Sequence, residues 1–142
     1  MSGENLRSKK EPTNMVPDII QVSRNTRYPL EAFVFVQRGL EFTVRRLHGA
    51  PDERTETTSR HVTGHDLCTG LRDYAIQEYG LLARMVLRRW NITGSEDFGQ
   101  IVFAMVDAKL LAKTDEDSIE DFRDIFDFDD AFAERLSLSE NS

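Results

Sequence analysis

The chain has 142 residues, of which 39% are apolar and 30% charged, and its net charge at neutral pH is −7. This length and composition predict one globular domain with its own hydrophobic core. One cysteine, Cys68, excludes an intramolecular disulfide. No apolar run approaches the ~20 residues that span a bilayer, and the N-terminus lacks the apolar stretch of a secretory signal. We therefore expect a cytoplasmic protein with no membrane contact.

Residues 1–17 are polar and predict a disordered N-terminal tail, followed by a short helix over Asp18–Arg24. Pro29 opens a clearer helix, and Gly49 supplies its C-terminal stop. The apolar residues of this helix step by three or four, which places them on one face. They are Phe33, Val36, Leu40, Val44 and Leu47.

Residues 50–60 show no apolar periodicity and predict a mobile loop. Thr63 to Asp66 has the form of a capping box, so a helix is expected to follow. Gly80 is expected to break or bend that helix. Its predicted buried stripe contains Leu67, Cys68, Leu71, Ala75 and Tyr79.

Two further helical segments are predicted downstream. The first covers Leu81–Trp90 and is expected to turn Leu82, Met85, Val86 and Trp90 inward. The second begins at a capping box formed by Thr93 to Glu96. Its predicted buried residues are Phe98, Ile101, Val102, Met105 and Leu110.

The pattern after Leu111 supports two structures. Helical spacing relates Ile119, Phe122 and Ile125, whereas residues 126–129 alternate between apolar and acidic types, as a strand would. A helix followed by a hairpin is the order of a winged-helix domain. The fold prediction is a mainly α, compact single-domain bundle of four to six helices over residues 18–133. A small wing-like β-hairpin after residue 111 stays open, and residues 134–142 form a polar C-terminal tail.

The charge of the chain is unevenly distributed. From Glu96 to Ser142 there are 14 acidic and 4 basic residues, a net charge of −10, whereas residues 1–95 carry +3. Such an acidic surface repels nucleic acid and anionic lipid and attracts a basic protein. One interpretation is a solvated face whose phenylalanines point inward. The other is a docking surface, in which aromatic side chains anchor a partner and carboxylates select it.

In the docking interpretation, the anchors are Phe122, Phe126 and Phe128. The selecting charges are Asp121, Asp124, Asp127, Asp129 and Asp130.

Only one cluster combines metal-ligand residue types at close spacing: His61, His65 and Cys68. On one helix, His65 and Cys68 would share a face, and His61 would reach back from the preceding turn. These three side chains would hold zinc with a fourth ligand from outside, or Cys68 would act as a nucleophile with His65 as base. However, no second ligand set exists in the sequence, and Cys68 lies on the apolar stripe, where a free cysteine packs. We therefore predict no cofactor.

Arginines on the predicted helices suggest a nucleic-acid alternative, with phosphate contacts in a helix-turn-helix arrangement. Nucleic-acid binding is nevertheless disfavoured, because the helix expected after Thr93 carries Glu96, Asp97 and Asp107. The arginines are Arg38, Arg45, Arg46, Arg84, Arg88 and Arg89.

Four phrases of the sequence resemble a family of small bacterial proteins. They begin at Tyr28 (YPLEAFVFV), His61 (HVTGHDL), Glu96 (EDFGQIVF) and Lys113 (KTDEDS, continuing to FDDAF). The family is an uncharacterised, conserved hypothetical one of planctomycete/verrucomicrobial type. The resemblance covers roughly residues 18–133 and implies a bacterial cytoplasmic protein, but no activity or site residue.

The sequence therefore predicts a non-enzymatic interaction or regulatory module that binds a basic protein through its acidic, aromatic-rich C-terminal part. A winged-helix transcription-associated regulator is one alternative. A metal- or thiol-dependent enzyme at His61, His65 and Cys68 is another. The opposite charges of the two parts of the chain leave self-association open.

Overall fold

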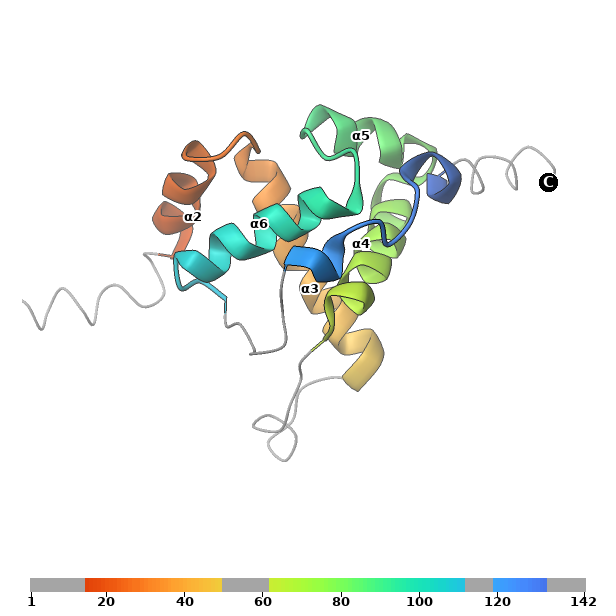
Figure 1. The fold of residues 1–142 in the computed structure, drawn as a ribbon, viewed down its shortest axis with the longest axis horizontal. Helices are drawn as coiled ribbons and strands as arrows, with labels where there is room; N and C mark the ends of the chain where they lie inside the picture. The colour runs from red at the N-terminus through yellow and green to blue at the C-terminus, as the bar shows by residue number, and fades with distance from the viewer. Residues whose placement is uncertain (1–14, 50–61, 112–118, 133–142) are drawn as a thin grey trace, which may run out of the picture.

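The computed structural model describes residues 15–49, 62–111 and 119–132 (Figure 1). These residues contain five α-helices, α2 to α6, and two short 3-10 helices, and none of them forms a strand. The prediction of a mainly α bundle of four to six helices is confirmed. The predicted loop at 50–60, the tail at 134–142 and most of the predicted N-terminal tail lie outside the described residues.

The first two helices are α2 (Met15–Arg24) and α3 (Leu30–His48). Helix α2 begins at Met15, three residues before the predicted start. Helix α3 begins after Pro29, whose φ of −74° suits a helix entrance. It ends at Gly49, which has a positive φ of 79° and donates its N–H to the Arg45 carbonyl at 2.8 Å. Both predicted ends of α3 are therefore correct to within a residue.

The buried face of α3 is confirmed at Phe33 and Val36 but shifts away from the predicted one toward the end of the helix. Leu47, expected inside, is 47% exposed, whereas Phe35, Gly39 and Thr43 are buried. The buried Thr43 hydroxyl donates a hydrogen bond to the Gly39 carbonyl of its own helix at 2.7 Å. The small residues Gly39 and Thr43 occupy this face because the neighbouring helix comes very close to it.

That neighbour is α4 (Gly64–Tyr79), which crosses α3 and runs back toward the other end of the bundle (Figure 1). A Cβ placed on Gly39 would lie 2.2 Å from Leu71 Cδ2, and one on Gly70 would lie 1.9 Å from Thr43 Oγ1. Any larger residue at Gly39 or Gly70 would force the helices apart. We call these two helices the α3–α4 pair.

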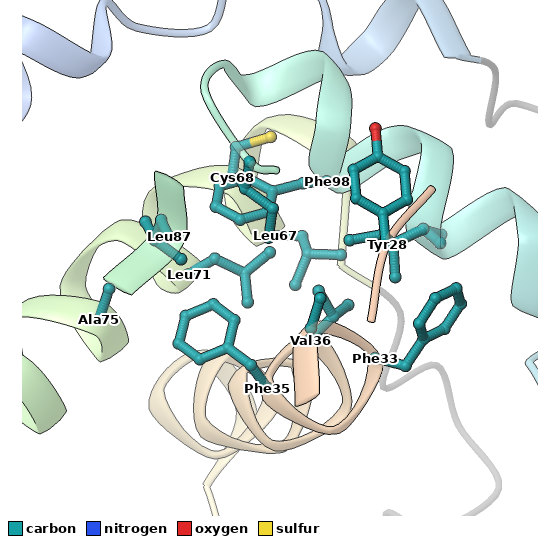
Figure 2. Close-up of a cluster of buried hydrophobic side chains, with 14 of the residues drawn as sticks. Tyr28, Phe33, Phe35, Val36, Leu67, Cys68, Leu71, Ala75, Leu87 and Phe98 are labelled. Carbon is teal, nitrogen blue, oxygen red and sulfur yellow. The ribbon is translucent and has the colours of Figure 1, made fainter. Parts of the chain in front are cut away.

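The start and the stripe of α4 match the sequence prediction. The Thr63 hydroxyl accepts a hydrogen bond from the Asp66 backbone N–H at 2.9 Å, as an N-cap does. Four of the five predicted stripe residues are buried, and Tyr79 is half-buried. Figure 2 shows several of them among the aromatic residues of the core. The buried four are Leu67, Cys68, Leu71 and Ala75.

The chain then turns at Gly80 through a 3-10 helix, η1 (Gly80–Leu82), into α5 (Ala83–Arg89). Gly80 has a φ of 55°, a conformation that favours glycine. The inward residues of α5 are Ala83 and Leu87, so the predicted inward orientation of Leu82 and Met85 is wrong. The tighter 3-10 turn changes the rotation at which α5 starts and moves the buried stripe.

Helix α6 (Ser95–Asp107) begins one residue later than the predicted capping box implies. Its N-cap is Gly94, and the Asp97 carboxylate accepts from the N–H groups of Thr93 at 2.9 Å and Gly94 at 3.2 Å. Glu96, the expected partner, is exposed. The buried face is as predicted for Phe98, Ile101, Val102 and Met105, whereas Leu110 is half-buried.

Asp97 also ties α6 to the turn before α3. Its carboxylate accepts hydrogen bonds from the Tyr28 hydroxyl and from the Arg27 guanidinium, the latter at 2.7 Å. Burial favours the neutral form of Asp97, but the hydrogen bonds from Tyr28, Thr93 and Arg27 outweigh it and lower the Asp97 pKa below its ordinary value. Asp97 is therefore a charged group at neutral pH although only 6% of it is exposed.

Beyond α6, the described chain resumes with a 3-10 helix, η2 (Ile119–Phe122), and ends in a helical turn over 128–132. The strand suggested by the alternation at residues 126–129 is not formed: Phe126 lies in a bend and Phe128 opens the helical turn. Phe128 and Phe132 are one helical turn apart, so both rings reach the core from the same side. The other residues of the suggested hairpin, 112–118, lie outside the described part.

Candidate functional site

The acidic segment (residues 119–132) is fixed to the bundle first through Phe122, which is 3% exposed. Its ring meets Phe103 edge-on, with centroids 5.9 Å apart. Two glycines make room for this segment: a Cβ on Gly99 would lie 2.8 Å from Phe122 Cβ, and one on Gly64 would lie 2.8 Å from Asp121 Cβ. Helix η2 thus packs against both α4 and α6.

A serine bridge provides the second attachment of the acidic segment. The Ser95 hydroxyl donates to the Phe122 carbonyl at 2.6 Å and accepts from the Ile125 N–H at 3.0 Å. Between these two contacts the chain turns at Asp124, whose φ is 51°. Ser95 was predicted only as part of a capping box, and its long-range role has no local signal in the sequence.

The third attachment is an aromatic cluster around Phe128. Its ring centroid lies 5.8 Å from Phe98, 5.4 Å from Phe132 and 5.4 Å from Phe126. Phe126 is half-buried, and the Arg72 guanidinium lies 5.6 Å from its ring centroid. Phe122 and Phe128 therefore belong to the core, and the prediction that they are surface anchors is wrong. Burial of their apolar area stabilises the attachment of the acidic segment to the bundle.

The aspartates of the acidic segment remain at the surface. Asp124, Asp127, Asp129 and Asp130 are exposed, and Asp121 is half-buried. Asp129 pairs with Arg84 of α5. Within the described residues, Asp124, Asp127 and Asp130 form no ion pair, although Asp127 Oδ1 accepts from the Asp130 N–H at 3.1 Å. These three charges are available to a partner.

Next to these charges lies an exposed apolar ridge, formed by Leu81, Leu82 and Met85. Their exposed fractions are 56%, 56% and 64%. Arg84 belongs to the same turn and contacts Asp129, so the apolar ridge adjoins the acidic segment. The ridge was not predicted from the sequence, because helical spacing placed Leu82 and Met85 in the core. The run of apolar residues directly after Gly80 was the only available signal.

The candidate metal and thiol site does not assemble within the described residues. His65 is exposed while Cys68 is fully buried, so their side chains do not converge, and His61 lies outside the described residues. Burial raises the pKa of the Cys68 thiol to about 12, which keeps it protonated at neutral pH. The described chain holds no group of three or more potential metal ligands.

The winged-helix alternative gains no support from the part of the chain that the structure describes. The hairpin that would distinguish it is missing from residues 119–132, which form a 3-10 helix, a bend and one helical turn. The candidate arginines belong to two separate helices, α3 and α5. Arg46 pairs with Asp73 at 2.7 Å and Arg84 pairs with Asp129, so two of them are neutralised within the chain.

Comparisons with protein-family models, with curated proteins and with solved structures find no match to this chain. The family resemblance of its four sequence phrases therefore stays a prediction. Among the helices in the described ranges, none has the length and apolar character required to cross a membrane.

Proposed function

We propose that this protein is a non-enzymatic interaction module whose acidic segment binds a basic protein partner. The observation that carries the proposal is the exposure of Asp124, Asp127 and Asp130 without an ion pair among the described residues. The segment contains six carboxylates and one arginine. Concentrating like charges costs electrostatic free energy, which a basic partner would recover on binding.

The structure changes which side chains would act as apolar anchors. Phe122 and Phe128 are occupied in the core, whereas the apolar ridge of Leu81, Leu82 and Met85 is exposed beside the aspartates. Exposed leucine and methionine side chains suit a helix-in-groove or helix-on-ridge contact. The partner surface expected here is an amphipathic helix with an apolar stripe bordered by lysine or arginine.

The proposal is tested by comparing two triple variants with the native chain. The first, D124N/D127N/D130N, removes three unpaired carboxylates of the acidic segment. The matched control, E41Q/E96Q/D107N, removes three exposed carboxylates elsewhere and changes net charge equally. Each protein captures partners from nuclease-treated lysate at low and at high salt, and mass spectrometry identifies them.

We expect a basic partner that elutes at high salt and binds the first variant about tenfold more weakly, because each exposed ion pair contributes up to about 1 kcal/mol. The control variant should bind as the native chain does. A second variant, L81A/M85A, should weaken binding of the same partner while leaving its salt dependence unchanged. Equal binding of the two triple variants would contradict the proposal.

A further inference from the structure

A second surface feature lies away from the acidic segment, where the first half of α3 passes the end of α4. It is a cavity of about 320 Å³, which we call the aromatic pocket. This volume is within the range that small-molecule sites occupy in proteins. Four aromatic residues line the pocket: Phe35, Tyr74, Tyr79 and Trp90.

The four rings form one continuous cluster. Phe35, which is 4% exposed, is its floor, and Figure 2 shows this ring projecting from α3 toward α4. Its centroid lies 5.4 Å from Tyr74 and 5.6 Å from Trp90, while Tyr79 meets Trp90 edge-on at 6.0 Å. Because Tyr74, Tyr79 and Trp90 are only half-buried, parts of their rings stay accessible from the pocket.

Two carboxylates and one guanidinium complete the lining. Glu31 belongs to the first turn of α3, Glu78 to the last turn of α4, and Arg38 to the middle of α3. All three residues are exposed. Burial, followed by the charge of Glu78, raises the pKa of Tyr74, whereas the charge of Arg38 lowers it. The lining therefore carries one net negative charge at neutral pH.

We propose that the aromatic pocket binds an organic cation of the alkylammonium class. Aromatic faces attract a cation through their quadrupole, and the attraction grows when the ring cluster shields the charge from water. Glu31 and Glu78 supply the compensating charge at the rim. An anion would meet both the negative ring faces and these carboxylates. The pocket belongs to different residues from the acidic segment, so this inference goes beyond the proposed function.

Arg38 makes it possible to test the sign of the ligand's charge. A cation in the aromatic pocket is attracted by Glu78 and repelled by Arg38, so neutralising either residue changes affinity, in opposite directions. A neutral ligand of the same shape would feel neither change. This pair of opposite effects distinguishes cation recognition from simple filling of an apolar cavity.

The chain provides its own reporter, because Trp90 is the single tryptophan of the sequence and lines the pocket. Choline is titrated into the protein while Trp90 fluorescence is recorded, in parallel with 3,3-dimethylbutan-1-ol, its neutral isostere. We expect choline to bind at least about fivefold more tightly than the alcohol, the contribution of one cation–π contact. Equal affinity of the two probes, or no fluorescence change with either, would overturn the proposal.

Three variants complete the test. Glu78→Gln should weaken choline binding by about threefold to fivefold, and Arg38→Gln should strengthen it by a similar factor, since each changes one exposed charge beside the ligand. Glu96→Gln, an exposed carboxylate on α6, is the matched control and should leave affinity unchanged. If both pocket variants shift affinity in the same direction, charge recognition is the wrong explanation.

The source of the cation is decided by a third probe, a capped peptide that carries trimethyllysine. Tighter binding of this peptide than of choline would indicate a protein side chain, and equal binding would indicate a free small molecule. Both results support the alkylammonium class. The acidic-segment variant D124N/D127N/D130N should bind choline as the native chain does, so failure of the proposed function would leave this inference standing.

Discussion

The α3–α4 pair and the acidic segment are both parts of one hydrophobic core, yet they are held in different ways. The pair consists of two long helices whose contact extends over several turns and closes tightly at Gly39 and Gly70. The acidic segment contains only a short 3-10 helix and one helical turn, and it is attached at Phe122, the Ser95 bridge and the Phe128 cluster.

This difference indicates where each region derives its stability. The pair is stabilised by backbone hydrogen bonds and by continuous packing, so it should open only when the protein unfolds globally. The acidic segment carries like charges that repel one another, and few backbone hydrogen bonds hold it. Loss of one attachment should therefore release the acidic segment while the rest of the bundle stays folded.

The largest effect is expected in the α3–α4 pair. Leu71→Ala removes a fully buried side chain between the helices and should lower the free energy of unfolding by about 3–5 kcal/mol. Leu81→Ala, at a position that is 56% exposed, is the control and should change it by less than about 0.5 kcal/mol. Chemical denaturation measures both. Cys68, which is fully buried in the same pair, should react with a thiol reagent only at the global transition.

A smaller and local effect is expected at the serine bridge. Ser95→Ala leaves the Phe122 carbonyl and the Ile125 N–H without their partner, which should cost about 2–3 kcal/mol. Hydrogen exchange should become faster in residues 119–132 before it does in α3 or α4. In Thr69→Ala, the lost hydroxyl bonds only carbonyls of its own helix, so no such local release should occur. If hydrogen exchange became faster by the same factor along the whole chain, the acidic segment would not be released separately from the bundle, and the prediction would be wrong.

The turn between α4 and α5 depends on the backbone conformation of Gly80. A Cβ on Gly80 would contact nothing within 4 Å, so the cost of Gly80→Ala comes from its φ of 55° and should be about 1–3 kcal/mol. Gly94→Ala is the matched substitution, because Gly94 has an extended φ of −159° that alanine adopts freely. Thermal unfolding of the two variants measures the difference. A similar melting temperature for both would exclude a role for the positive φ.

The smallest effect separates Asp97, the one buried carboxylate among the residues that the structure describes, from the exposed ones. The Asp97 pKa is lowered in the folded state, so its contribution is fully present above the unfolded-state value of about 4 and is lost as pH falls through the folded pKa. Asp97→Asn should cost about 1 kcal/mol at pH 7, and its difference from the native chain should shrink below about pH 4. Unfolding measured from pH 7 to pH 3 tests this.

The exposed Asp124 serves as the control for the loss of one negative charge. Asp124→Asn removes a carboxylate that forms no ion pair within the described residues, so it should change the free energy of unfolding at pH 7 by less than about 0.5 kcal/mol. If Asp124→Asn cost as much at pH 7 as Asp97→Asn does, the assignment of the Asp97 effect to its hydrogen bonds would be wrong.

The sequence by itself determined the helices of the first two thirds of the chain. Periodic apolar residues, Pro29 with Gly49, and the Thr63 cap all act within a few residues, so α3 and α4 could be placed almost to the residue. The buried stripes of α4 and α6 followed from the same local spacing. Inward-pointing phenylalanines in the acidic segment were one of the two interpretations that the composition allowed, and both interpretations placed its aspartates at the surface.

Only the tertiary structure decided which face of a helix is covered. Thr43 is buried and Leu47 exposed because Gly70 brings α4 close to the former, and the 3-10 turn at Gly80 leaves Leu82 and Met85 outside. The Ser95 bridge, the burial of Phe122 and Phe128, and the aromatic pocket join residues far apart in the chain. Local spacing carries no information about such contacts, because they depend on how whole helices pack and not on the residues within one turn.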